Sequence, residues 1–271
     1  MKFFAVVLHV LFVSAALAVD IETLNGPNLL GVVRVTSASE YLPLSVCWGA
    51  IGYSDSAPAA DALVLTSGLE PGDSLYVYDR ANSQYRVFDL VRNDTGDEWQ
   101  ARAVVHISDG QVETVSGDSA DATPLAIGYG AWLHRPGVAS RSNQTVLVVG
   151  QVQRSGVTVE LAAAPSGKSF GQTLFGLPVP ATGNFKLNGG TIDWATAGAV
   201  AGDEIRVPQA DGSQETIRFD GTKWVRKYFV VVNGVNRLKT DTNPEIVAGT
   251  AVWYARKAGN GPISITVEAQ Q

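Results

Sequence analysis

The segment closest to a known catalytic motif is residues 162–169, AAAPSGKS. It follows a predicted strand at 157–161 and ends in Gly167-Lys168-Ser169, like a loose phosphate-binding loop. Such a loop needs free backbone N–H groups and a following helix whose N-terminus faces the phosphates. Here Pro165 lacks an N–H, and residues 170–180, FGQTLFGLPVP, show no helical pattern. We therefore predict a turn between two strands and no nucleotide site.

Histidine and acidic residues form no recognisable metal or catalytic motif. His106 and His134 have no Cys or carboxylate at ligand spacing. Asp118 and Asp121 suit calcium by chemistry, but their loop lacks the ligand ladder of an EF-hand. No Gly-x-Ser-x-Gly elbow is present. We expect no catalytic residue, no metal and no cofactor, while carboxylates from distant strands can still meet in space as a hydrolase pair.

Two aspartates recur at matching places and need a structural explanation. Gly72-Asp73 and Gly202-Asp203 each precede a predicted strand. An aspartate in such a turn accepts hydrogen bonds from nearby backbone N–H groups. We expect both aspartates to hold turns.

The elements around these residues are predicted to be strands. The 28 glycines and 12 prolines separate short runs rich in Val, Ile, Thr and aromatic residues. Several runs alternate with period two: Leu75 and Val77 share one face, while Tyr76 lies on the other. No long stripe with the helical period of 3.6 residues is present. The chain is predicted to be all-β.

An internal duplication is indicated by two segments, PLAIGYGAWLHR at 124–135 and PEIVAGTAVWYAR at 244–256. Gly128, Trp132 and Arg135 correspond to Gly249, Trp253 and Arg256 at a constant spacing of 121 residues. We predict a signal peptide at 1–18 and two homologous units at 19–152 and 153–271. Each unit is expected to be an antiparallel β-sandwich or a partly open barrel.

Further correspondences extend the duplication. Trp99 matches Trp224, and Tyr85 with Val87 is set against Ile217 with Phe219. The dipeptides at 109–110 (Asp-Gly) and 233–234 (Asn-Gly) favour type I′ hairpin turns because both central positions need positive φ.

The six tryptophans divide into two groups. Four recur at matching places and are predicted to fill the repeat cores; these are Trp99, Trp132, Trp224 and Trp253. Trp48 and Trp194 have no counterpart, so they are the candidates for stacking on a ligand such as a sugar ring.

The N-terminus predicts export. Lys2, an apolar run at 3–17 and small residues at Ala16 and Ala18 form a signal-peptide pattern. The formal charge of −6 becomes −7 without Lys2, and an acidic chain does not favour nucleic acid. The lone Cys47 cannot form an internal disulfide. Asn93 and Asn143 begin N-glycosylation patterns.

The chain resembles an uncharacterised family of exported bacterial proteins with tandem β repeats. The resemblance rests on the Gly-Asp turn, on FDGTKW at 219–224 and on AGTAVWYAR at 248–256. It implies secretion and a β fold, and it carries no catalytic residues.

From these observations we expect a non-enzymatic, secreted or cell-surface structural protein that assembles with itself or with other surface proteins into a layer or fibre. The first alternative is a carbohydrate-binding module that uses exposed Trp and Tyr. The second is a glycan hydrolase with carboxylates from both units.

Overall fold

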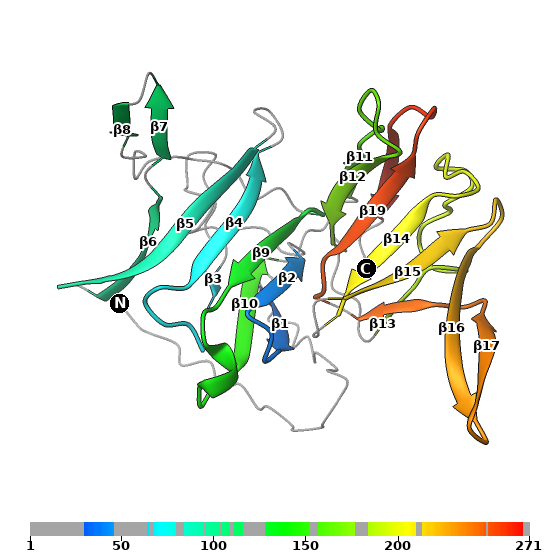
Figure 1. Ribbon diagram of the computed structural model, residues 1–271, viewed down its shortest axis with the longest axis horizontal. Helices are drawn as coiled ribbons and strands as arrows, with labels where there is room; N and C mark the ends of the chain where they lie inside the picture. The colour runs from blue at the N-terminus through cyan, green and yellow to red at the C-terminus, as the bar shows by residue number, and fades with distance from the viewer. Residues whose placement is uncertain are drawn as a thin grey trace.

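Strands are the dominant element of the described chain, and no α-helix occurs within it, as the all-β prediction requires. The computed structural model describes residues 30–45, 64–65, 68–79, 84–94, 96–102, 104–108, 111–115, 128–151, 157–176, 184–209, 213–247 and 249–267 (Figure 1). Within these ranges no helix has the length and apolarity needed to cross a membrane. The predicted signal peptide, Trp48, Cys47, Asp118 and Asp121 lie outside the described residues.

The first half of the chain builds one five-stranded antiparallel sheet and two smaller ones. The five-stranded sheet has the order β2 (Tyr41–Ser45), β9 (Gly130–His134), β4 (Ser74–Asp79), β5 (Gln84–Asn93), β6 (Gly96–Ala101). A second sheet joins β1 (Leu30–Thr36), β10 (Thr145–Gln151) and β3 (Val64–Leu65), and a hairpin joins β7 (Val104–Ser108) to β8 (Gln111–Val115). A single 3-10 turn, Val138–Ser140, lies between β9 and β10.

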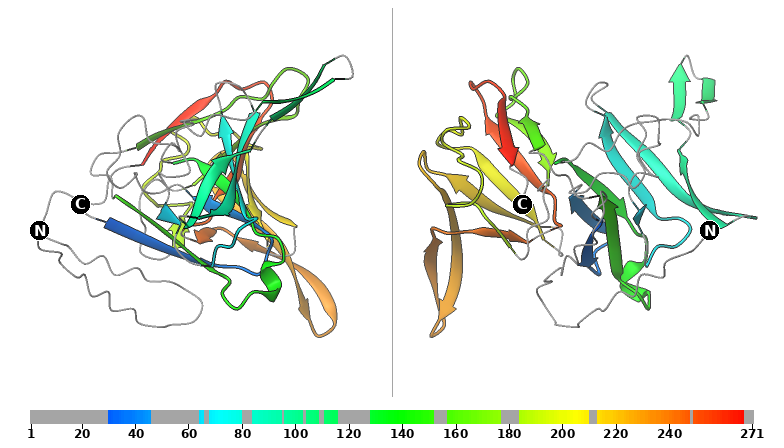
Figure 2. Two further views of the ribbon diagram at one scale, coloured as in Figure 1. Left: turned by 90° about the vertical axis from the view of Figure 1, so that its left-hand side faces the viewer. Right: turned by 180° about the vertical axis from the view of Figure 1, so that it is seen from behind.

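The second half builds a six-stranded antiparallel sheet and two strand pairs. The sheet has the order β12 (Phe170–Phe175), β19 (Val252–Lys257), β14 (Glu204–Pro208), β15 (Gln214–Phe219), β16 (Trp224–Val232), β17 (Val235–Asp241). The pairs are β11 (Val157–Leu161) with β20 (Ile263–Val267) and β13 (Asn184–Lys186) with β18 (Glu245–Val247). The large sheet curls, and its curvature is visible from several sides (Figure 2).

The five-stranded sheet and the first five strands of the six-stranded sheet, β12 to β16, share one strand order and one register. Leu75 pairs with Leu133 in the first sheet as Ile205 pairs with Tyr254 in the second. In the same way, Leu90 of β5 faces Trp99 and Phe219 of β15 faces Trp224. The origin of this correspondence in a duplication stays a prediction, and the boundary predicted near residue 152 lies outside the described residues.

One detail of the sequence alignment is wrong. Leu90, and not Val87, is the counterpart of Phe219, because both exchange backbone hydrogen bonds with the preceding Gly-Asp turn. The error is three residues, and an odd shift along a strand moves every side chain to the opposite face. Tyr85 and Val87 therefore point away from the core, whereas Ile217 and Phe219 point into it.

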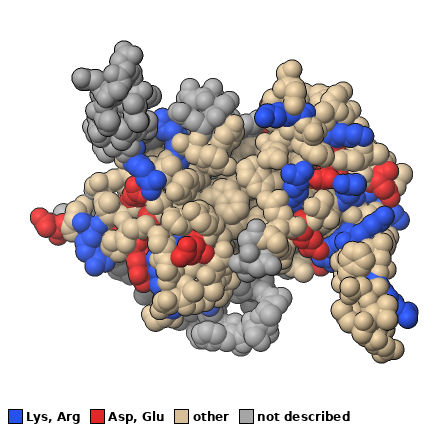
Figure 3. All heavy atoms as spheres, viewed as in Figure 1, with Lys and Arg blue, Asp and Glu red and all other residues tan. Residues whose placement is uncertain are grey.

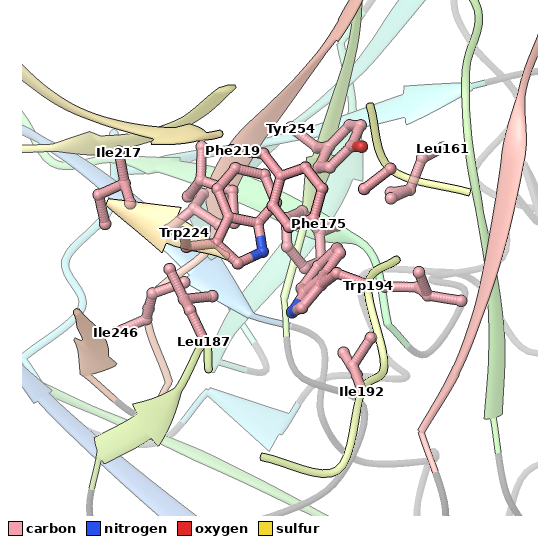
Figure 4. Packing of buried hydrophobic residues seen from close by; sticks show 14 of the residues in the cluster. Leu161, Phe175, Leu187, Ile192, Trp194, Ile217, Phe219, Trp224, Ile246 and Tyr254 are labelled. Carbon is pink, nitrogen blue, oxygen red and sulfur yellow. The ribbon is translucent and has the colours of Figure 1, made fainter. Parts of the chain in front are cut away.

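The core of the second half contains Trp194, which contradicts its predicted role in ligand stacking. The residue is only 4% exposed, and its ring lies 5.2 Å from that of Trp224 and 6.0 Å from that of Tyr254 (Figure 4). It belongs to the loop 187–200, which also places Leu187 and Ile192 in the same cluster. The loop fills the curled sheet because a strongly bent sheet leaves interior volume that its own side chains do not occupy.

The four tryptophans predicted to fill the cores behave differently from one another. Trp224 is fully buried, and Trp99 packs partly buried against the core of the first half. Trp132 and Trp253 are only partly buried, which contradicts the prediction that they are core residues. Their neighbours in the strand, Leu133 and Tyr254, take the inward positions, so alternation directs both tryptophans to the outer faces.

A buried carboxylate organises the second half. Asp203 is fully buried and accepts a hydrogen bond from Arg256, another from the Tyr254 hydroxyl at 2.6 Å, and two from the backbone N–H groups of Lys257 and Val200. Burial, followed by the hydrogen bond to Asp203 and then the charge of that carboxylate, raises the pKa of Tyr254. The carboxylate thus joins the turn before β14 to its neighbour β19, as the capping role predicted from sequence requires.

Asp73 holds the corresponding turn in the first half with a different arginine. Its carboxylate accepts hydrogen bonds from Arg141 at 2.6 and 2.9 Å. Arg135, which matches Arg256 in the strand register, instead donates to the carbonyl oxygens of Gly68 and Gln144. The buried charge is therefore neutralised in both halves, although from different positions in the chain.

The two halves meet through reciprocal backbone contacts. Ser45, at the end of β2, donates its N–H to the Gly249 carbonyl at 3.0 Å. Gly176, just after β12, donates to the Gly128 carbonyl at 3.1 Å. Isolated bridges repeat the relation, since Leu44 pairs with Thr250 and Tyr129 pairs with Phe175. In each half, the end of one strand therefore pairs with backbone of the other half.

The contact is close because it is made at small residues. A Cβ atom on Gly130 would lie 2.6 Å from both the Ala251 Cβ and the Leu174 Cγ. Gly128 and Gly249 also have positive φ, of 89° and 81°, which an L-residue adopts at a cost. The glycines shared by the two repeat segments thus serve the joint between the halves.

Replacing Gly176 by alanine will destabilise the protein by about 1–3 kcal/mol, because the new methyl group collides with the Ser45 side chain across a joint with no room to yield. Gly261→Ala is the matched control, since a Cβ there meets nothing within 4 Å. Thermal unfolding followed by circular dichroism measures both variants. Equal unfolding temperatures would contradict a tightly packed joint.

Replacing Asp203 by alanine will cost about 3–5 kcal/mol, because it leaves the buried Arg256 guanidinium without a counter-charge. Urea unfolding monitored by tryptophan fluorescence measures the loss. Asp220→Ala is the control, since this aspartate is also in a turn but is exposed. A loss at Asp203 no larger than the loss at Asp220 would show that the buried carboxylate is not central to stability.

Candidate functional site

The outer face of the five-stranded sheet carries six aromatic side chains. Strand alternation sends Leu75, Val77, Ala131 and Leu133 into the core and the intervening residues outward. We call the aromatic residues of this outer face the aromatic band; they are Tyr41, His134, Trp132, Tyr76, Tyr78 and Tyr85. It spans four neighbouring strands, β2, β9, β4 and β5.

The aromatic band runs diagonally across the sheet in three cross-strand pairs. Tyr41 faces His134, Trp132 faces Tyr76, and Tyr78 faces Tyr85. The first pair is stacked with ring centroids 4.4 Å apart, and the last pair meets edge to face at 5.2 Å. From Tyr41 to Tyr85 the band crosses three strand spacings in one direction and four residues along the strands in the other. The diagonal of these two displacements is about 20 Å.

Its ring surfaces are accessible at both ends. Tyr41 is 54% exposed at one end, and Tyr78 and Tyr85 are 42% and 41% exposed at the other. Burial, followed by the charge of Tyr78, raises the pKa of Tyr85, while a hydrogen bond with Trp132 opposes the shift. The Tyr85 hydroxyl therefore stays uncharged and able to donate a hydrogen bond at neutral and mildly alkaline pH.

A polar cluster lies beside the middle of the aromatic band. Arg102 donates to the Asp89 carboxylate at 2.6 and 2.8 Å and to the Ser74 hydroxyl at 3.1 Å, and Ser74 donates to Asp89 at 2.7 Å. The Arg102 guanidinium also lies 5.9 Å from the centre of the Tyr76 ring. The Arg102 hydrogen bond is the main reason that the pKa of Asp89 is lowered. The cluster thus offers fixed donors and acceptors next to flat rings.

The second sheet shows that the fold does not require these aromatics. Where Tyr41 faces His134, the second sheet pairs Gln172 with Ala255. Where Tyr78 faces Tyr85, it pairs Pro208 with Gln214. Tyr76 is replaced by Arg206, which with Arg218 binds Glu204.

Of the aromatic band, only the tryptophan recurs, since Trp253 occupies the position of Trp132. Both sheets therefore reach the same strand order with different outer faces. The aromatic band is a feature of the first sheet that strand pairing and core packing leave unexplained.

Several sequence candidates are placed by the structure and do not form a site. Residues 162–169 make the predicted turn between β11 and β12, and no helix follows. His134 stacks on Tyr41, and the described residues contain no group of three His, Cys, Asp or Glu able to hold a metal. The side chain of His106 lies outside the described set, and Asn143 is exposed.

Sequence reasoning missed most of the aromatic band. The alternation of Tyr76 and Tyr78 with Leu75 and Val77 is a usable signal, because it puts both tyrosines on the outer face. The contribution of Tyr41 depends on the pairing of β2 with β9, whose residues are about ninety positions apart. No local pattern contains that register.

No model of a protein family, no curated protein and no solved structure matches the chain.

Proposed function

We propose that the protein is a non-enzymatic, exported surface or extracellular protein that binds a neutral, linear polysaccharide along the aromatic band. The observation that carries the proposal is the diagonal row of six exposed or partly exposed rings on a sheet that does not need them. The signal-peptide pattern at residues 1–18 supports the exported location.

The chemistry of the aromatic band suits a sugar. A pyranose ring has apolar C–H faces and a rim of hydroxyl groups, so it needs flat apolar surfaces beside hydrogen-bonding groups. Tyrosine and tryptophan supply both, and the cluster of Arg102, Asp89 and Ser74 adds further donors and acceptors. A length of about 20 Å fits an extended chain of several rings better than a single sugar.

Charge argues for a neutral ligand. Residues 19–152 contain seven Arg and no Lys against sixteen Asp and Glu, a formal charge of −9. A half with this net formal charge disfavours the approach of phosphate and sulfate groups within roughly one Debye length. A neutral polysaccharide pays no such cost.

The residues that the structure describes give no specific support to the hydrolase alternative. The deeply buried carboxylates, Asp73 and Asp203, bind arginines and hold turns. Nearer the surface, Asp89 binds Arg102 and Asp97 binds Arg92. Binding without catalysis is the simpler proposal, because a binding role accounts for the aromatic residues of the band and requires no pair of catalytic carboxylates.

Replacing Trp132 by alanine will weaken polysaccharide binding about tenfold or more, because a truncated central aromatic contact typically costs more than 1 kcal/mol. The Tyr78→Ala, Tyr85→Ala double variant will weaken it by a similar factor at one end. Affinity electrophoresis against a panel of neutral plant, fungal and bacterial polysaccharides selects the ligand, and titration calorimetry then measures the dissociation constants.

Trp253→Ala is the matched control, since this tryptophan has the same register in the second sheet without the flanking aromatics. It should leave binding unchanged. The proposal fails if the wild-type protein binds nothing in the panel, or if Trp253→Ala weakens binding as much as Trp132→Ala does.

A further inference from the structure

The hairpin of β16 and β17 projects from the body of the second half. Strand β15 pairs with β16 only at Trp224–Arg226, so residues 227–240 have no sheet partners among the described strands other than each other. Figure 1 shows this ribbon extending at the lower right, away from the first half. Its tip is the predicted type I′ turn, with φ of 53° at Asn233 and 75° at Gly234.

Both faces of this ribbon expose large apolar side chains. On one face Phe229 pairs with Leu238, and these residues are 71% and 56% exposed, next to Val231 at 70%. On the other face Tyr228 and Val235 are also exposed. A two-stranded ribbon is marginally stable alone in water, and clustered exposed apolar residues mark interaction surfaces.

The ribbon is also basic. Lys227, Arg237 and Lys239 are exposed, and the hairpin as a whole carries four Lys or Arg against Asp241 alone. Figure 3 shows the ribbon at the lower right as mainly uncharged surface with Lys and Arg at its margins. Its preferred partner is therefore acidic as well as apolar.

The first half of the chain is acidic in sequence. Residues 19–152 have a formal charge of −9, whereas residues 153–271 have twelve Lys and Arg against ten Asp and Glu, a formal charge of +2. The two halves of one chain are thus complementary in charge. The ribbon points away from the first half of its own chain, so it can meet an acidic half only on another copy.

Strand β17 adds a backbone edge. It is the last strand of its sheet, so one row of its N–H and C=O groups has no strand partner among the described residues. Natural sheets protect such an edge with a bulge, a proline, a short strand or charged side chains. β17 has seven residues and no proline within Val235–Asp241, and its register with β16 has no bulge. Its charged residues Arg237 and Lys239 oppose pairing with another basic edge and leave the edge open to an acidic partner.

We infer that the β16–β17 hairpin binds the acidic first half of a second copy of this chain, so that copies join head to tail. A contact between two hairpins is disfavoured because it would bring like charges together. A head-to-tail contact uses different surfaces on the two copies, and it therefore continues into a ring or an open filament. This contact does not depend on the proposed polysaccharide binding.

Analytical ultracentrifugation of the purified protein over a concentration series tests the contact. The wild-type protein should form species larger than dimers, and these should dissociate in high salt. Phe229→Ser, Val231→Ser, Leu238→Ser should raise the dissociation constant at least tenfold without unfolding the protein, since these side chains lie outside the core. Val247→Ser is the control, because Val247 is 63% exposed on β18, outside the hairpin.

A mixing experiment tests the head-to-tail direction. The triple variant Lys227→Glu, Arg237→Glu, Lys239→Glu reverses the charge of the hairpin and keeps the acidic first half. This variant should therefore cap wild-type assemblies and shorten them. Larger assemblies in the mixture would instead indicate hairpin-to-hairpin pairing and overturn the inference. A wild-type protein that stays monomeric up to millimolar concentration would also overturn it, as would binding of the hairpin to anionic phosphatidylserine vesicles without any self-association.

Discussion

The fold depends on one buried carboxylate in each half, because Asp73 and Asp203 hold the turns that start the central strands. Asp203 contacts the turn, the Tyr254 hydroxyl and the backbone and side chain of the next strand, so it fixes the position of β14 against β19. A buried charge is tolerated only when it is fully paired, which leaves very few geometries open. The register of the sheet, and with it the identity of its two faces, follows from this constraint.

Once the register is set, the alternation of side chains along each strand gives the inner and outer faces of the sheets different roles. The inner faces of both sheets carry the same class of residues, large and apolar, and differ mainly in how much the loop 187–200 adds to the second core. The outer faces diverge: the first is aromatic, and the second carries the Glu204 ion cluster. Shared inner faces explain the common fold, and the outer faces are where the halves can acquire separate functions.

The sequence predicts those parts of the structure that depend on local spacing. The all-β class, the Asn233-Gly234 turn, the capping aspartates and the burial of Trp224 all follow from patterns of a few residues. The sequence does not predict the burial of Trp194, because an unmatched tryptophan in a loop gives no sign that the loop packs into the interior of a curled sheet. Trp132 and Trp253 recur as a core residue would, but recurrence conserves a position in the register and does not tell which face it occupies.

The two proposed surfaces lie on different halves, and this separation has a physical consequence. A single aromatic face on a sheet binds a flexible polymer weakly, because the polymer loses conformational freedom along the whole contact. If the basic hairpin of each copy holds the acidic half of the next, the aromatic bands recur at a fixed spacing along the assembly. A polysaccharide long enough to reach several bands then binds each later band at a high effective concentration, so modest individual contacts add up to a stable attachment. The opposite charges of the two halves would thus drive assembly, and the aromatic face of the first sheet would bind the ligand. Assembly would strengthen ligand binding without any change at the binding face.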